Sequence, residues 1–440
     1  GGRPALADSH GVVLHPVIVA ATLLWGVING TKIAFVASLA MAGLAQWWLA
    51  RVLRLGWVAR LWSAAMVVVG GHLSGKIDSG IFALVLSTAA ASLVIAPWLD
   101  LALRPRRRAV VLAAATLALV AVSGQAYLQL GVLLGLLPAC AVFLLDDQWR
   151  WQPRVWKGFV AAAALTALLA GVFLVPLVHF YPSFVKNLDA AHRSAQALEY
   201  APLNLLIRNV DFYRNEDLGK TVYPYLHVSY VGWITVLLAI IAVRLAPAAD
   251  RRILAFLAAA IALIYLAASG LTFRALGAIL PEFAAGVRNP SLTAGLAVPL
   301  VLGLAAWGLD RLLQLNWPEL ALIVGDPESG AARLRIKASW LALLVPLVWS
   351  VRSGYELGRN YIQTTTVQAE HYQVVQALTP EAAQWVHPPF GEQFWQGMTV
   401  EAGLKTTQVI LPWGWRDRTF PAPAVEAVRG PVDASAGTVI

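Results

Sequence analysis

The chain has 440 residues, of which 59% are hydrophobic and only 13% are charged, and its formal net charge is +9. This composition contains more apolar surface than a soluble core of this length needs, so it excludes a soluble globular protein. The positive charge does not indicate a nucleic-acid partner, because the Lys and Arg residues occupy short segments between apolar runs, where they orient membrane helices.

Ten apolar segments follow one another and predict an all-α membrane protein with about ten transmembrane helices. A helix needs about 20 apolar residues to cross the hydrocarbon core of a bilayer, whereas a β-barrel would show short alternating segments. The segments cover residues 31–50, 57–71, 78–103, 109–122, 125–145, 158–180, 225–246, 251–270, 292–312 and 337–352. Residues 57–71 and 109–122 are short for a crossing, so each is either a span or a kinked, partly buried helix.

Every second connection between these segments is basic. The basic connections contain Arg51, Arg54 and Arg60, then Arg104 and Arg106 to Arg108, then Arg150, Arg154 and Lys157, then Arg244, Arg251 and Arg252, then Arg311, Arg333, Arg335 and Lys337. The positive-inside rule places them in the cytoplasm and the other connections, with both chain ends, outside. We therefore expect a transmembrane bundle over residues 1–352 and a small extracytoplasmic region of α/β or irregular structure over residues 353–440.

Three extracytoplasmic segments carry candidate ligand-binding residues. The long loop 182–224 contains Lys186, Arg193, Arg208 and Arg214. The loop 271–291 ends in Arg288, which is placed either to hold a phosphate or to snorkel to the membrane surface. The segment 70–80 contains His72 and Lys76 between four glycines. It is either a tight hairpin with solvated charges or the lining of an external cleft.

The sequence lacks the common catalytic motifs. It contains no HExxH, GxSxG or CxxC motif and no Walker lysine loop, which argues against a metalloprotease, a serine hydrolase, a thiol enzyme and an ATP-driven pump. Asp100 and Asp310 lie at predicted cytoplasmic helix ends beside arginines, as solvated charges do. The single Cys140 excludes an internal disulfide and is expected to be a packing residue.

Four short sequence features resemble the GT-C superfamily of glycosyltransferases. They are the opening Gly1-Gly2-Arg3-Pro4-Ala5-Leu6 through His15-Pro16, Gly71-His72-Leu73, Pro97-Trp98 and Arg288-Asn289-Pro290-Ser291. The resemblance implies an inner-membrane enzyme with an external active site. It would transfer a sugar with inversion from a polyprenyl-phosphate-linked donor to a lipid, glycan or protein acceptor.

The resemblance also implies roles for particular residues. The catalytic base would be an acidic residue in the first external loop, for which Asp8 with His10 is the candidate, with a divalent cation as a possible cofactor. The candidates for binding the substrate and neutralising the donor phosphate are His72, Lys76, Lys186, Arg193, Arg208, Arg214 and Arg288. The family further implies a transmembrane helix upstream of that loop, so we expect about 20 apolar residues and an acid before Gly1.

Two other functions fit the same sequence. A non-catalytic scaffold subunit of a larger complex would retain the bundle and its alanine-rich helices, which favour close packing, without the catalytic acid. A lipid or glycan flippase is the second alternative. All three functions involve membrane lipids, and the scaffold also requires protein subunits as partners.

Overall fold

The computed structural model describes residues 11–78, 82–145, 150–180, 184–185, 195–208, 227–324, 332–361 and 414–415. The chain divides into two compact units, one of residues 1–180 and 188–362, the other of residues 181–187 and 363–440. The described part of the second unit is a short antiparallel pair, β1 (Phe184–Val185) with β4 (Gly414–Trp415). The rest of the predicted C-terminal region beyond Tyr361 lies outside the described residues.

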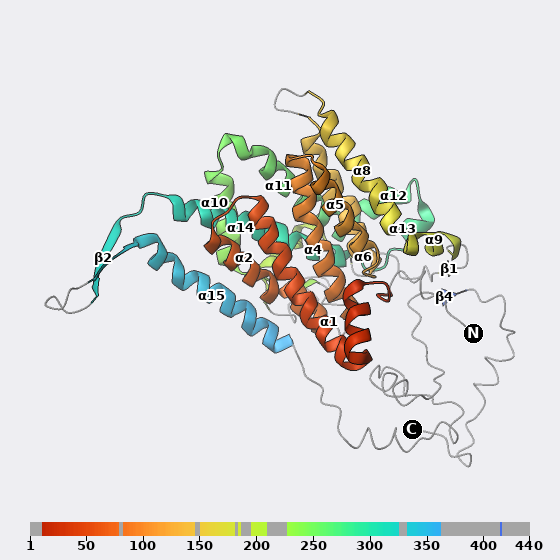
Figure 1. Cartoon of the computed structure of the whole chain (residues 1–440), viewed down its shortest axis with the longest axis horizontal. Helices are drawn as coiled ribbons and strands as arrows, with labels where there is room; N and C mark the ends of the chain where they lie inside the picture. Colours follow the sequence, from red (N-terminus) through yellow and green to blue (C-terminus); the bar gives the residue numbers. More distant parts are fainter. Residues whose placement is uncertain are drawn as a thin grey trace, which may run out of the picture. The chain divides into compact units, whose positions relative to one another are not determined.

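The first unit is mostly helical (Figure 1). Its N-terminal half consists of α1 (Pro16–Val52), α2 (Trp57–Val69), α3 (Gly71–Asp78), α4 (Phe82–Leu103), α5 (Arg107–Ala121), α6 (Ala126–Gly131), η2 (Val132–Leu136), α7 (Leu137–Ala139), η3 (Cys140–Phe143), α8 (Pro153–Leu169) and α9 (Gly171–Phe180). The second half consists of η5 (Leu198–Tyr200), η6 (Pro202–Leu205), α10 (Trp233–Leu245), η10 (Ala248–Asp250), α11 (Arg251–Ala268), α12 (Leu271–Gly277), α13 (Pro281–Ala285), η11 (Pro290–Leu296), α14 (Ala297–Gln314), β2 (Glu319–Val324), β3 (Ala332–Lys337) and α15 (Ala338–Tyr361).

Each of the ten predicted apolar segments contains a helix, but the expected ten crossings are not confirmed. Five helices of the described chain are long and apolar enough to cross a membrane, or six if the bent pair α8 and α9 is one span. The spans are Asn29–Val52, Phe82–Leu103, Ala126–Phe143, Ala248–Ala268 and Pro290–Gln314. Part of the difference comes from short or bent helices: α2 has 13 residues and α5 has 15, α8 and α9 bend by 72°, and the segment 225–246 is helical only from Trp233.

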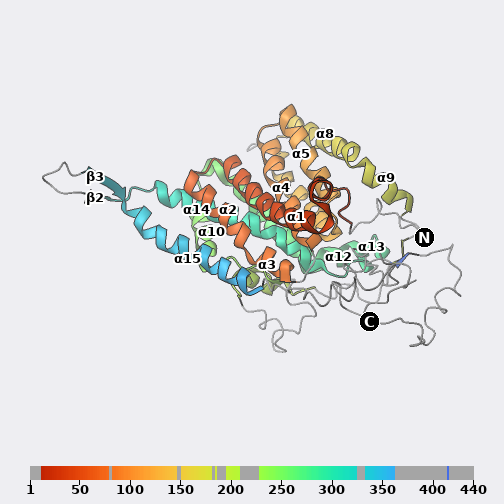
Figure 2. The ribbon, with the colours of Figure 1, turned by 60° about the horizontal axis from the view of Figure 1, so that its bottom comes forward.

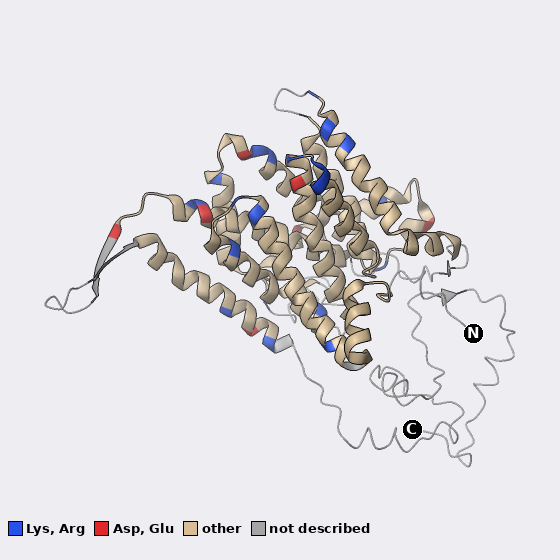
Figure 3. Ribbon diagram, viewed as in Figure 1, with Lys and Arg blue, Asp and Glu red and all other residues tan. Residues whose placement is uncertain are grey.

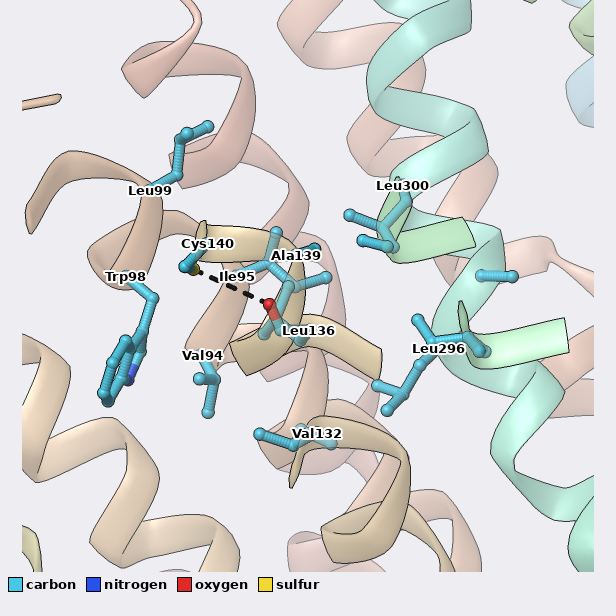
Figure 4. Close-up of a cluster of buried hydrophobic side chains, with 14 of the residues drawn as sticks. Val94, Ile95, Trp98, Leu99, Val132, Leu136, Ala139, Cys140, Leu296 and Leu300 are labelled. Atoms are coloured by element: carbon cyan, nitrogen blue, oxygen red, sulfur yellow. Dashed lines mark hydrogen bonds between the residues drawn. The ribbon is translucent and has the colours of Figure 1, made fainter. Parts of the chain in front are cut away.

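The core forms where α4, α6 to η3, α11 and α14 meet. Figure 4 shows Ile95 and Leu99 of α4, Leu136 and Cys140, and Leu296 and Leu300 in one buried cluster. The Cys140 thiol points to the Leu136 carbonyl at 3.6 Å, so its predicted packing role is confirmed. α10 and α14 approach closely because residue 308 is glycine: a Cβ there would collide with the Leu238 carbonyl. Small residues allow such helix contacts in membrane proteins.

The predicted basic connections meet at one end of the bundle, which we call the basic end. Figure 3 shows Lys and Arg gathered where α5, α8 and α11 begin. Asp310 of α14 accepts a hydrogen bond from Gly56 N–H at 2.8 Å, and Arg311 contacts Asp250 at 3.1 Å. Asp100 contacts Arg106 at 2.9 Å. Asp100 and Asp310 are therefore nearly buried and hydrogen-bonded, rather than solvated as predicted from the sequence.

The antiparallel hairpin of β2 and β3 connects α14 to α15 and lies at the left of Figure 1. Its register pairs Leu320 with Ile336 and Leu322 with Leu334. The hairpin interrupts a stretch that the sequence assigned to a cytoplasmic connection. It closes at its base, where Ala338 N–H donates to the Pro318 carbonyl at 2.9 Å.

Candidate functional site

At the end of the bundle opposite the basic end, α3 packs between three segments that are distant in sequence; we call this the α3 end (Figure 2). Gly71 N–H donates to the Tyr230 carbonyl at 2.9 Å. A Cβ on residue 71 would lie 2.6 Å from Tyr230 N, so only glycine allows this backbone contact. On another side, a Cβ on Gly358 of α15 would lie 3.1 Å from Ser74 Oγ.

Lys76 is buried inside this end of the protein, at 3% exposure. Its ammonium donates to Thr88 Oγ1 of α4 at 2.7 Å and lies against Gly295 of η11, where a Cβ would collide with it. Burial lowers the pKa of Lys76 to about 7, because the charged form loses its hydration. A lysine in this state exchanges its proton near neutral pH.

His72, one helical turn earlier, is also buried. Burial first, and then the nearby Lys76 charge, holds its pKa well below the usual value, so the imidazole is neutral. Neither ring nitrogen has a hydrogen-bond partner among the described residues. The alternative of a hairpin with solvated charges is wrong, because α3 is a helix in which the His72 and Lys76 side chains are buried.

His227 lies in the segment that pairs with the start of α3, and it is buried as well. Burial lowers its pKa to about 4, so it is neutral at physiological pH. Of the other histidines, the structure describes His15, which caps α1 by accepting from Val17 N–H at 3.2 Å, and His179 at the end of α9.

Arg288 stands just before η11, the segment that also carries Gly295, and its side chain is half-buried. The Tyr127 hydroxyl of α6 lies beside the backbone of Arg288 and Asn289. A 3₁₀ helix rises about 2 Å per residue, so the five steps from Pro290 to Gly295 span about 10 Å. Arg288 and Lys76 therefore lie near opposite ends of η11.

Arg208 also lies at the α3 end, where it forms an ion pair with a carboxylate. Its guanidinium lies 3.5 Å from Glu356 of α15, which also accepts from Arg352 Nε at 2.9 Å. The Arg352 hydrogen bond and the two positive charges lower the pKa of Glu356. The other predicted site residues, Asp8, His10, Lys186, Arg193 and Arg214, lie outside the described residues.

A cavity of about 320 Å³ opens between η5 and the start of α12. Its lining includes Gln196, Glu199, Ser269 and Arg274. A carboxylate, a guanidinium and two neutral polar groups around one cavity suit a hydroxyl-rich ligand. Glu199 and Arg274 were not predicted as site residues, because nothing in their spacing shows that residues from two separate segments share a cavity.

The described residues contain no group of three or more His, Cys, Asp or Glu side chains that could hold a metal ion. Asp8 and His10, the residues predicted to act with a divalent cation, are not among them.

Comparison with solved structures gives a likeness in fold. No family model matches the chain, and no curated protein matches its sequence. A cryo-EM structure of the arabinofuranosyltransferase AftD from Mycobacteria superposes with a TM-score of 0.50 over 91% of this chain, at 16% sequence identity. The two chains share a fold. The match spans 28% of the AftD chain. At this level of identity the likeness concerns the fold and not the activity.

Proposed function

We propose that this protein transfers a sugar from a polyprenyl-phosphate-linked donor to a lipid, glycan or protein acceptor at the outer face of the inner membrane. The observation that carries the proposal is the arrangement of Arg288 and Lys76 at the two ends of η11, in a fold shared with an arabinofuranosyltransferase. The donor and the acceptor would enter from the α3 end.

Arg288 would bind the donor phosphate. A guanidinium offers several N–H donors in a plane that matches phosphate oxygens, and its half-buried position limits competition from water. Lys76 is too buried to touch a substrate, so we assign it as a positioning residue. Its ammonium fixes η11 against α4 and adds positive potential to a region of low dielectric.

The reaction itself needs a proton acceptor. The acceptor hydroxyl would form a bond to the anomeric carbon while the bond from that carbon to the donor phosphate breaks, and the polyprenyl phosphate would leave with the electron pair. The hydroxyl proton would pass to a carboxylate. Asp8 with His10 is the candidate named from the sequence, and Glu199 is the carboxylate that lines the described cavity.

The test is sugar transfer by the full chain in reconstituted vesicles, supplied with a polyprenyl-phosphate-linked sugar. Arg288→Gln should lower the initial rate at least about tenfold, because a hydrogen-bonded charge pair with the phosphate is lost. Arg359→Gln, at an exposed position on α15, is the matched control and should keep the rate. Equal rates in the two variants would show that Arg288 does not bind the donor.

The scaffold alternative makes a different prediction for the same material. A scaffold subunit should copurify with stoichiometric partner proteins and show no transfer with any polyprenyl-linked sugar. The close contacts of α14, whose Gly308 touches α10, fit a rigid scaffold as well as an enzyme. The transfer assay therefore separates the two, whereas the packing does not.

A further inference from the structure

The register of the hairpin of β2 and β3 separates apolar from charged residues. Successive residues of a strand alternate between the two faces of a sheet, and residues paired directly across an antiparallel ladder share a face. Three consecutive pairs of alternate residues are entirely apolar and lie on one face, which we call the apolar face: Leu320 with Ile336, Leu322 with Leu334, and Val324 with Ala332.

The other face, which we call the charged face, carries every charged residue of the two strands. Its pairs are Glu319 with Lys337, Ala321 with Arg335, and Ile323 with Arg333. This division is typical of strands that have one face against apolar material and the other in water. A hairpin of two strands is marginally stable in water by itself, so it needs a surface that covers its apolar face.

The hairpin extends to one side of the bundle, away from the helices of its own unit, in both Figure 1 and Figure 2. Each strand has six residues and is therefore about 20 Å long. The surface that covers the apolar face is thus expected to lie beside the bundle and to be of similar length.

Both ends of the hairpin are attached to elements at the edge of the membrane. The span that contains α14 ends at Gln314, shortly before β2 begins. α15 follows β3 directly, and its Leu344 and Val345 are 57% and 71% exposed. Soluble proteins seldom expose large apolar side chains in such groups, whereas a helix that faces lipid does.

Tryptophan side chains lie near the base of the hairpin. Trp340, in the first turn of α15, has its ring centroid 6.0 Å from that of Trp57 at the start of α2, and both side chains are exposed. Trp317, just before β2, donates from its indole N–H to the Leu312 carbonyl at 2.8 Å. Tryptophan is enriched at the boundary between membrane and water, so the base of the hairpin is at the level of this boundary.

We propose that the hairpin of β2 and β3 lies on the membrane surface at the basic end, with its apolar face in the boundary between lipid headgroups and acyl chains and its charged face toward water. Lipid is favoured over a protein partner because both ends of the hairpin adjoin membrane helices. The contact is made through the apolar face, so it requires no particular partner for the charged residues. It does not rest on sugar transfer, which the α3 end would perform.

The experiment uses the full chain in phosphatidylcholine vesicles, with a nitroxide label on one introduced cysteine at a time. The native Cys140 is the single cysteine of the sequence and is buried, so labelling is directed to the introduced residue. Leu322→Cys reports on the apolar face. Ala321→Cys, the adjacent residue on the charged face, is the matched control. Power saturation of the EPR signal compares collisions with oxygen, which enters lipid, and with a nickel chelate, which stays in water.

We expect the label at residue 322 to collide mainly with oxygen, about 5–10 Å below the level of the phosphates, as amphipathic elements at the interface do. The label at residue 321 should collide mainly with the nickel chelate. Leu334→Cys and Arg335→Cys should repeat this contrast on β3.

Three other results would overturn the proposal. The same preferred reagent at residues 321 and 322 would show that the two faces do not differ in environment. Low access of both reagents to residue 322 would show that protein covers the apolar face. Dipolar broadening between labels on different copies would identify that protein as a second copy of this chain.

Discussion

At the basic end of the bundle, the carboxylates of Asp100, Asp250 and Asp310 contact arginines or a backbone N–H group. At the α3 end, Lys76 and His72 are buried, and the Lys76 ammonium donates to the Thr88 hydroxyl at 2.7 Å. At the first end, the contacts of these carboxylates connect separate helices and turns and stabilise the fold. Burial of the Lys76 amine instead disfavours its charged form, which lowers its pKa.

The largest expected effect is a pH dependence of stability that originates at Lys76. Its pKa is about 7 in the folded protein and 10.5 as an ordinary lysine. Between these values the unfolded chain binds the proton more strongly, so stability should rise as pH increases from about 7 toward 10.5, by up to about 1.4 kcal/mol per pH unit. Unfolding temperatures of the wild type and of Lys76→Met across this range provide the measurement. The slope should be absent from the variant, and parallel curves would show that Lys76 does not cause it.

A steric change at the α3 end should have the next largest effect. Gly71→Ala places a Cβ against the Tyr230 backbone, which cannot rotate away, so we expect a loss of up to about 3 kcal/mol. Gly171→Ala at the start of α9 is the control, since a Cβ there has nothing within 4 Å. Denaturant titration of both variants in detergent measures the difference. Similar midpoints would mean that α3 and residues 228–230 do not pack in this way.

At the basic end, Asp310→Ala should cost about 1.5 kcal/mol, because the Gly56 N–H and the Gln314 amide lose a charged acceptor on a nearly buried residue. Asp310→Asn keeps an acceptor oxygen and should recover part of the loss. The comparison of unfolding temperatures tests whether this carboxylate is structural. An Asp310→Ala protein as stable as the wild type would contradict it.

The smallest effect is expected for an ion pair at the same end whose arginine is exposed. Arg106→Gln removes one partner of Asp100, but Arg104 remains within 3.6 Å and both arginines are solvated. We expect a change below about 1 kcal/mol, reduced further by salt. The free energy of unfolding, measured at low and at high ionic strength, tests this expectation. A larger loss that persists in salt would mean that the basic end depends on this pair.

Much of the bundle could be predicted from the sequence, since long apolar runs such as those of α4, α11 and α14 identify helices by composition alone. The number of crossings could not, because α2 and α10 are short and the bend between α8 and α9 depends on packing. At the candidate site, the glycines and the lysine of residues 70–80 could be identified from the sequence. Their burial could not be predicted, because it depends on contacts with Thr88, Tyr230 and Gly295 from three other segments.

The measurement that tests the central claim most directly is the stability and the sugar-transfer rate of one variant, Lys76→Met. An apolar side chain of similar length removes the desolvation penalty, and Thr88 still donates to the Leu84 carbonyl at 2.6 Å. We predict an unfolding temperature at pH 7 equal to or above that of the wild type, together with a rate at least about tenfold lower. A fall in unfolding temperature with an undiminished rate per folded molecule would contradict the account, because Lys76 would then serve the fold alone.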